Sequence, residues 1–141
     1  MNTSLISAEA KAGYLEALVR AQIRAASGAA EGRGQTIDFK VRGSTRPVLA
    51  DARCLSQAVS YMLLNAVRLG CPDSCVQVVL DYGASEAVLS IRAVEDGEPP
   101  QVADAQLEDA RTTLEGYGGS LKIGVGPDGG MLAAALPLMK A

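Results

Sequence analysis

The sequence predicts an α/β (α+β) fold of two layers, in which a mixed, mostly antiparallel sheet carries its helices on one face. Three observations lead to this prediction. Segments with helical periodicity and segments that alternate like strands follow one another in the order helix, strand, helix, hairpin, helix, hairpin. The later strands are joined by short turns, which only antiparallel neighbours allow. Because these hairpins return directly, the helices must lie together on one face of the sheet.

The first half of the chain predicts two helices and one strand. Residues 7–27 are rich in alanine, leucine and charged residues at helical spacing, and we expect this helix to end at the glycine-rich break 28–34. Residues 36–42 alternate between apolar and polar, as a half-buried strand does. Asp51 is a suitable N-cap for the next helix and Gly70 a suitable stop. Apolar residues spaced by three and four predict the buried stripe of that helix: Leu55, Val59, Met62, Leu63 and Ala66.

The second half predicts two hairpins with a helix between them. The expected strand pairs are 75–82 with 86–94 and 120–125 with 131–138. Residues 96–103 are expected to form a loop, and residues 104–117 a helix. Gly118 and Gly119 follow that helix, so they are expected to be its C-cap rather than a phosphate-binding loop.

Length and composition favour one globular domain. The chain has 141 residues, of which 48% are hydrophobic and 21% charged, enough apolar residues for a normal core. We expect a single domain over residues 1–141, with an entry helix in residues 1–30 and the α/β sandwich in residues 31–141.

Charge and hydropathy exclude several classes of function. The chain has 13 Lys and Arg against 16 Asp and Glu, a net charge of −3, and no basic run, so we expect no nucleic-acid partner. We find no secretory signal pattern and no apolar run of the roughly 20 residues that cross a bilayer. We therefore expect no membrane contact in this segment and a cytoplasmic location.

Cysteine and histidine usage narrow the chemistry further. The three cysteines, Cys54, Cys71 and Cys75, have no framework spacing, which favours free thiols in a reducing compartment. The chain contains no histidine, which excludes Ser-His-Asp and Cys-His triads and a phosphohistidine on this chain. No residue of this chain is predicted to be catalytic.

Two groups of residues are typical of a nucleotide and magnesium site. Asn65 lies on the shoulder of the apolar face of its helix, followed one turn later by Arg68. Glu95, Asp96 and Gly97 form an acidic turn beside a glycine, directly after a predicted strand. An amide on a helix opposite a carboxylate at a strand end can contact the metal and the base of a nucleotide.

Four segments, in their order and spacing, resemble the catalytic ATP-binding domain of sensor histidine kinases. The segments are EGRGQTIDFKV, VLADARCLSQAVSYMLLNAVRL, IRAVEDGEPP and LEGYGGSLKIGVGPDGGMLAAALPL. This family is a branch of the GHKL superfamily of gyrase, heat-shock-90, histidine kinase and mismatch-repair ATPases, and the resemblance covers about residues 15–138. It implies the same sandwich fold and a place in bacterial two-component signalling.

The resemblance also implies roles for single residues. The residues that match the family's N-box are Gln57, Leu63, Asn65, Ala66 and Arg68. In that box the asparagine binds the magnesium ion held by the nucleotide phosphates. Glu95, or Asp96 one residue later, takes the place of the adenine-binding aspartate, next to Gly97. ATP and Mg²⁺ are therefore the cofactors that the family would bring.

Several residues depart from the family pattern. The N-box usually has a second polar residue four positions before its asparagine, where this chain has Tyr61, and Pro99 stands where a second glycine is expected. The span before the last helix is too short for the family's ATP lid. It also lacks the glycine motif whose backbone amides hold phosphates. Three carboxylates stand near this helix start instead: Asp104, Glu108 and Asp109. These departures imply weak or absent ATP binding.

Three interpretations follow. The chain is a degenerate domain that acts by binding a protein partner, such as a response regulator or another kinase, and is no enzyme on its own. Alternatively, it is a working ATP-binding domain that phosphorylates a histidine on another segment or chain. A third interpretation is a regulator that sequesters a transcription factor, as the related anti-sigma kinases do. A homodimer would form through a missing or an N-terminal helical segment.

The same residues have simpler interpretations. Asn65 is either a magnesium ligand or a relic amide bonded to nearby backbone. Residues 95–97 either bind adenine or only close a strand. Arg68 either neutralises phosphate or interacts with the helix dipole. The alanine-rich entry helix either packs on the sandwich or docks a partner helix.

Overall fold

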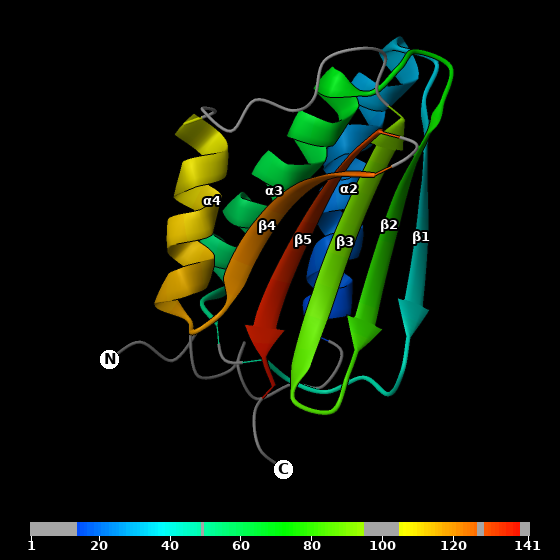
Figure 1. Cartoon of the computed structure of the whole chain (residues 1–141). Coiled ribbons are helices and arrows are strands. Elements are labelled where there is room, and N and C mark those ends of the chain that lie inside the picture. Colours follow the sequence, from blue (N-terminus) through cyan, green and yellow to red (C-terminus); the bar gives the residue numbers. More distant parts are fainter. Residues whose placement is uncertain (1–13, 49, 95–104, 127–128, 139–141) are drawn as a thin grey trace.

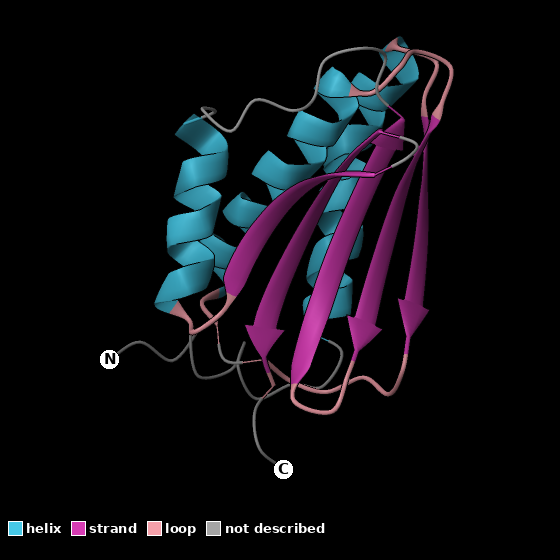
Figure 2. Cartoon of the chain, viewed as in Figure 1, coloured by secondary structure: helices cyan, strands magenta, loops and turns pink. Residues whose placement is uncertain are grey.

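The computed structural model describes residues 14–48, 50–94, 105–126 and 129–138. In this part of the chain, three helices cover one face of a five-stranded sheet, and the other face carries no helix (Figure 1, Figure 2). The elements are α2 (Tyr14–Gly32), β1 (Thr36–Arg42), α3 (Ala52–Leu69), β2 (Cys75–Tyr82), β3 (Glu86–Val94), α4 (Ala105–Gly116), β4 (Ser120–Gly126) and β5 (Gly129–Pro137). The predicted two-layer sandwich is confirmed.

The sheet has the strand order β1-β2-β3-β5-β4. β1 runs parallel to β2, and all other neighbours are antiparallel. The connection between the two parallel strands runs through a helix, α3, as parallel neighbours require. The sheet is therefore mixed and mostly antiparallel, as predicted.

The core lies between the helices and the covered face of the sheet. The predicted stripe of α3 is buried in full. α3 lies between α2 and α4, which pack against its two flanks (Figure 1). Leu15, Leu18 and Val19 bury one face of α2, so this helix packs on the sandwich. Its Arg20 guanidinium lies over the ring of Phe39 in β1, 4.9 Å from the ring centroid.

The end of α2 differs from the prediction. The helix continues through the predicted break and ends at Gly32. Ala26 and Ala30 are both buried in this stretch, and their packing outweighs the helix propensity that Gly28 lacks, about 1 kcal/mol relative to alanine. The chain turns at Gly34, whose φ of +71° favours glycine.

The last hairpin also differs from the prediction. Residues 126–130 were expected to be a turn, but β4 continues to Gly126 and β5 begins at Gly129, and these two residues pair with each other. Pairing between strands uses backbone groups that every glycine has, so the lack of side chains does not end the strands.

The predicted C-cap of α4 is confirmed. The N–H groups of Gly118 and Gly119 donate to the carbonyls of Glu115 and Leu114, and Gly118 has a φ of +81°. A side chain at Gly119 would lie 2.0 Å from the carbonyl oxygen of Ala135, so the close approach of α4 to β5 requires glycine there. Within the described residues, no helix has the length and apolar character needed to span a membrane.

Candidate nucleotide site

The described elements that carry or precede the predicted site residues meet at one end of the molecule. The C-terminal end of α3, the N-terminal end of α4 and the end of β3 all lie at the upper end of the molecule in Figure 1. The N–H of Cys71, just after α3, donates to the carbonyl of Val94 at the end of β3, with 2.6 Å between the atoms. Glu95, Asp96 and Gly97 follow Val94 and lie outside the described residues. The structure therefore shows where their segment begins but not where their side chains lie.

Asn65 is a buried amide on the flank of α3. Its side chain is 6% exposed, and in the described part of the chain only Asn65 and Gln35 are buried polar residues. Helical spacing places Asn65 on the same flank as Cys54 and Ala58. This flank lies toward α4, because Ala58 lines the same cavity as Leu114 of α4, and the Cys54 thiol is near enough to the Tyr117 hydroxyl to contribute to its raised pKa. Asn65 therefore lies on the side of α3 that faces α4.

The contact between α3 and the residue after α4 involves a partly buried phenol. The hydroxyl of Tyr117 accepts a hydrogen bond from the backbone N–H of Asp51, with 3.0 Å between the atoms. Burial raises the pKa of Tyr117, and the hydrogen bond from Asp51 partly offsets this effect. The phenol stays neutral at physiological pH. It joins the start of α3 to the end of α4 and has no direct part in the candidate site, which lies at the opposite end of α3.

Tyr61 lies one turn before Asn65. Its hydroxyl accepts a hydrogen bond from the side-chain amide of Gln57, with 2.9 Å between the atoms. Gln57 lies one turn before Tyr61, and Asn65 one turn after it. The hydroxyl of Tyr61 is therefore bonded on the side away from the side chain of Asn65. Arg68 lies in the last turn of α3 with an exposed side chain. A cation at this position interacts favourably with the helix dipole.

The start of α4 carries negative charge. Glu108 lies in the first turn, and its carboxylate pairs with Arg111 over 2.6 Å. Asp109 is exposed beside it, and Asp104 lies outside the described residues. The N-terminus of a helix attracts anions, and here a carboxylate of the same helix is already next to it. Within the described residues, Asp, Glu and Cys do not gather in groups of three that could hold a metal ion.

Two side chains that the sequence analysis missed hold the C-terminal end of α3. Nη2 of Arg33 donates to the carbonyl of Gly70 over 2.6 Å. Nε2 of Gln35 donates to the carbonyls of Val67 and Cys71 over 3.1 and 3.2 Å. These bonds satisfy carbonyls that a helix end leaves without partners. The turn after α2 thus fixes the segment that carries Asn65.

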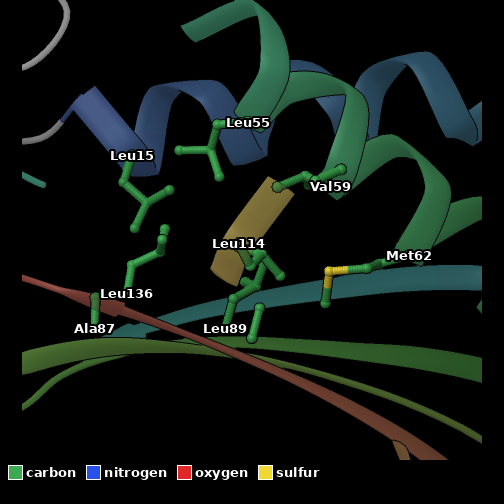
Figure 3. A pocket seen from close by; sticks show the side chains of 10 residues that line it. Leu15, Leu55, Val59, Met62, Ala87, Leu89, Leu114 and Leu136 are labelled. Atoms are coloured by element: carbon green, nitrogen blue, oxygen red, sulfur yellow. The ribbon is translucent and has the colours of Figure 1, made fainter. Parts of the chain in front are cut away.

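A small cavity lies inside the core, away from this end. It has a volume of about 10 Å³ and lies between the three helices and strands β3 and β5 (Figure 3). Its lining consists of apolar side chains: Leu15, Leu55, Ala58, Val59, Met62, Ala87, Leu89, Leu114, Ala134 and Leu136. A void of this size holds one water molecule at most and offers it no polar partner. It is a packing defect rather than a nucleotide site.

Comparison with known proteins supports the fold. No family model matches the sequence, and no curated protein matches it. Solved structures match most of the chain. The nucleotide-free catalytic domain of histidine kinase ThkA has a TM-score of 0.80 at 13% identity, with 90% of this chain and 95% of that chain covered.

Two further solved structures match over a similar length. The mycobacterial sensor histidine kinase MprB has a TM-score of 0.72 at 20% identity, covering 90% of this chain and 96% of that one. Full-length ShkA in complex with AMPPNP has a TM-score of 0.77 at 20% identity, covering 90% of this chain and 30% of that one. At identities of 20% or less, structural similarity establishes the fold alone. This chain therefore has the fold of the catalytic ATP-binding domain of sensor histidine kinases.

Proposed function

We propose that this chain is a degenerate histidine-kinase-type ATP-binding domain that acts as a protein-interaction module in two-component signalling. It binds ATP weakly or not at all, and it has no enzymatic activity on its own. Its partner is a response regulator or another kinase, and it acts in the cytoplasm. The domain spans residues 1–141 as one unit.

The observation that carries this proposal is the start of α4. A phosphate-binding helix start offers free backbone amides and positive potential. In this chain the first turn of α4 adds the carboxylate of Glu108 to this environment, and Asp109 adds a second exposed carboxylate. The carboxylate of Asp109 would repel a triphosphate bound beside Asn65, whereas the charge of Glu108 is partly balanced by its ion pair with Arg111. The carboxylate of Glu108 already interacts favourably with the positive end of the helix dipole, so a bound anion is not needed there.

The environment of Asn65 supports the same proposal. Its side chain is buried, and Tyr61 takes the position one turn earlier, with its hydroxyl bonded to Gln57. A phenol is a poor substitute for a metal-orienting amide, because Mg²⁺ favours carboxylate, carbonyl and water oxygens. In this interpretation Asn65 is a structural residue of the core of α3 and not a metal ligand.

A working ATP-binding domain is the second candidate. It is favoured by the position of Asn65 on the flank that faces α4, at the end of the layer where β3 ends. ShkA, which shares this fold, was solved with AMPPNP. Asn65 would then contact Mg²⁺, Glu95 or Asp96 the base, and Arg68 the phosphates.

Thermal denaturation with Mg-AMPPNP separates the two candidates. A ligand at a hundredfold its dissociation constant stabilises a protein by about 2.7 kcal/mol. We expect millimolar Mg-AMPPNP to leave the melting temperature unchanged, while ShkA, which was solved in complex with AMPPNP, serves as the positive control.

Two arginine variants make a positive result interpretable. Arg68→Ala removes the candidate phosphate contact, and Arg53→Ala removes an exposed arginine at the other end of α3. A stabilisation by Mg-AMPPNP that Arg68→Ala abolishes and Arg53→Ala preserves would contradict the proposal and establish the second candidate.

A further inference from the structure

β1 is an edge strand with one unpaired side. In the strand order, β1 has β2 as its single neighbour, and no other described strand pairs with it. Its outer edge lies at the right of the sheet in Figure 1, on the side away from β4 and α4. Unpaired backbone groups on such an edge are a template for another strand.

The register shows which residues direct their backbone groups outward. The N–H of Thr36 donates to the carbonyl of Ser74 over 3.1 Å, so Thr36 points toward β2. Backbone groups of successive strand residues point to alternate sides. Ile37, Phe39 and Val41 therefore direct their N–H and C=O groups to the free edge.

The sequence of β1, TIDFKVR, is self-complementary about its central residue. In an antiparallel pair of two such strands centred on Phe39, Phe39 opposes Phe39 of the second copy. Ile37 then opposes Val41, and Asp38 opposes Lys40, each of these contacts occurring twice by symmetry. Apolar residues meet apolar residues, and opposite charges meet.

We propose that two copies of this chain dimerise through their β1 edges, in antiparallel register centred on Phe39, to form one continuous sheet. The outward-directed residues Ile37, Phe39 and Val41 form the hydrogen-bonded pairs. Asp38 and Lys40 then fall at the non-hydrogen-bonded positions, where facing side chains lie closest. The same edge is used by both copies, so the contact closes at a dimer.

The charges select a second copy over an unrelated strand. Asp38 and Lys40 are both exposed, on the face of the sheet that carries no helix. A partner strand must present a cation opposite Asp38 and an anion opposite Lys40 at the same spacing. An antiparallel copy of β1 meets this requirement without further residues. The dimer does not rest on the proposed function, because the β1 edge is remote from the nucleotide end of α4.

Charge reversal tests the dimer. In Asp38→Lys a lysine faces Lys40 of the other copy, and in Lys40→Asp an aspartate faces Asp38. Each single variant thus replaces two attractive pairs by two repulsive ones, and the double variant D38K/K40D restores attraction with the signs exchanged. Sedimentation equilibrium of the full chain should show a wild-type dimer. Each single variant should raise the dissociation constant by about tenfold or more, and the double variant should return it close to wild type.

A matched control lies on the opposite edge of the sheet. Lys122 in β4 is exposed on the same face as Lys40, and Lys122→Asp should leave the dissociation constant unchanged. All substituted side chains are exposed, and thermal denaturation checks that each variant folds. A chain that is monomeric at every concentration, or a dimer that both single reversals leave intact, would overturn the proposal.

Amide hydrogen exchange gives a second, position-specific readout. On dimerisation, the amides of Ile37, Phe39 and Val41 should gain protection. The amides of Asp38 and Lys40 should change little, because they already bond to β2. Protection that rises elsewhere in the chain and not at these three amides would place the contact on another surface and reject the β1 edge.

Discussion

Gln35 is a buried residue that joins two elements far apart in the sequence. Its side-chain amide donates to the carbonyls of Val67 and Cys71, at the end of α3. The carbonyl of Val67 belongs to the last turn of α3, where no partner exists within the helix itself. The carbonyl of Cys71 follows the helix and also accepts a hydrogen bond from the hydroxyl of Ser74. The side chain of Gln35 is 3% exposed, so water cannot readily replace its bonds.

Removing this amide should destabilise the protein. Gln35→Leu leaves the carbonyl of Val67 without its donor and removes one of the two donors of the Cys71 carbonyl, which keeps its bond from the Ser74 hydroxyl. We expect the free energy of unfolding to fall by about 1–3 kcal/mol. Gln57→Leu is the matched control, because Gln57 is an exposed glutamine of α3 whose side-chain amide donates to a neighbouring phenol. That change should cost less than about 0.5 kcal/mol. Urea denaturation measures the free energy of unfolding of both variants. An equal decrease in the two variants would show that the bonds of Gln35 to the end of α3 do not stabilise the protein.

Asn65 shows how far a single residue could be interpreted from the sequence. Helical periodicity placed it at the shoulder of the apolar face, and the structure confirms that it is buried on α3. Which neighbour it faces was not predictable, because this depends on how α4 packs against α3. The bonds made by Arg33 and Gln35 were missed for the same reason: their partners lie more than thirty residues away.

At the scale of elements, the sequence predicted the ends of the first three strands more accurately than the structure of glycine-rich segments. β1, β2 and β3 have the predicted bounds, since alternating apolar residues begin and end with the strand. Gly28 and Gly126 were interpreted as breaks, yet one lies within α2 and the other within β4. Glycine lowers the propensity for regular structure but does not forbid it, and here tertiary packing decided.

Two glycines with opposite environments test this account of the elements. A Cβ at Gly28 would have no atom within 4 Å, whereas a Cβ at Gly119 would lie 2.0 Å from the carbonyl oxygen of Ala135. Gly28→Ala should raise the free energy of unfolding by about 0.5–1 kcal/mol through helix propensity. Gly119→Ala should lower it, because α4 and β5 must move apart. Chemical denaturation of both variants checks the signs, and a stabilising Gly119→Ala would refute the close approach.

At the scale of the whole molecule, the fold and the candidate site follow different constraints. The fold needs only the apolar pattern and the turns, and a sequence with no more than 20% identity to the three solved structures compared above keeps it. A nucleotide site needs particular groups at particular positions. Asn65 is present, but the first turn of α4 carries the carboxylate of Glu108. The proposed module, which keeps the fold of a kinase domain without its chemistry, is consistent with both observations.

The β1 edge and the nucleotide end of the helix layer would serve different purposes in such a module. The β1 edge is free of α4 and of the candidate site. A dimer formed there would leave the nucleotide end of the helix layer open to a partner in both copies. Dimerisation and partner binding can therefore be tested separately.

The most direct test of the central claim is an NMR titration of the isotopically labelled chain with Mg-AMPPNP, following the side-chain amide of Asn65. The account predicts that its resonances, and the backbone amide of Arg68, do not move at millimolar nucleotide. A saturable shift concentrated at Asn65 and Arg68 would show that the magnesium site is intact and would contradict the account.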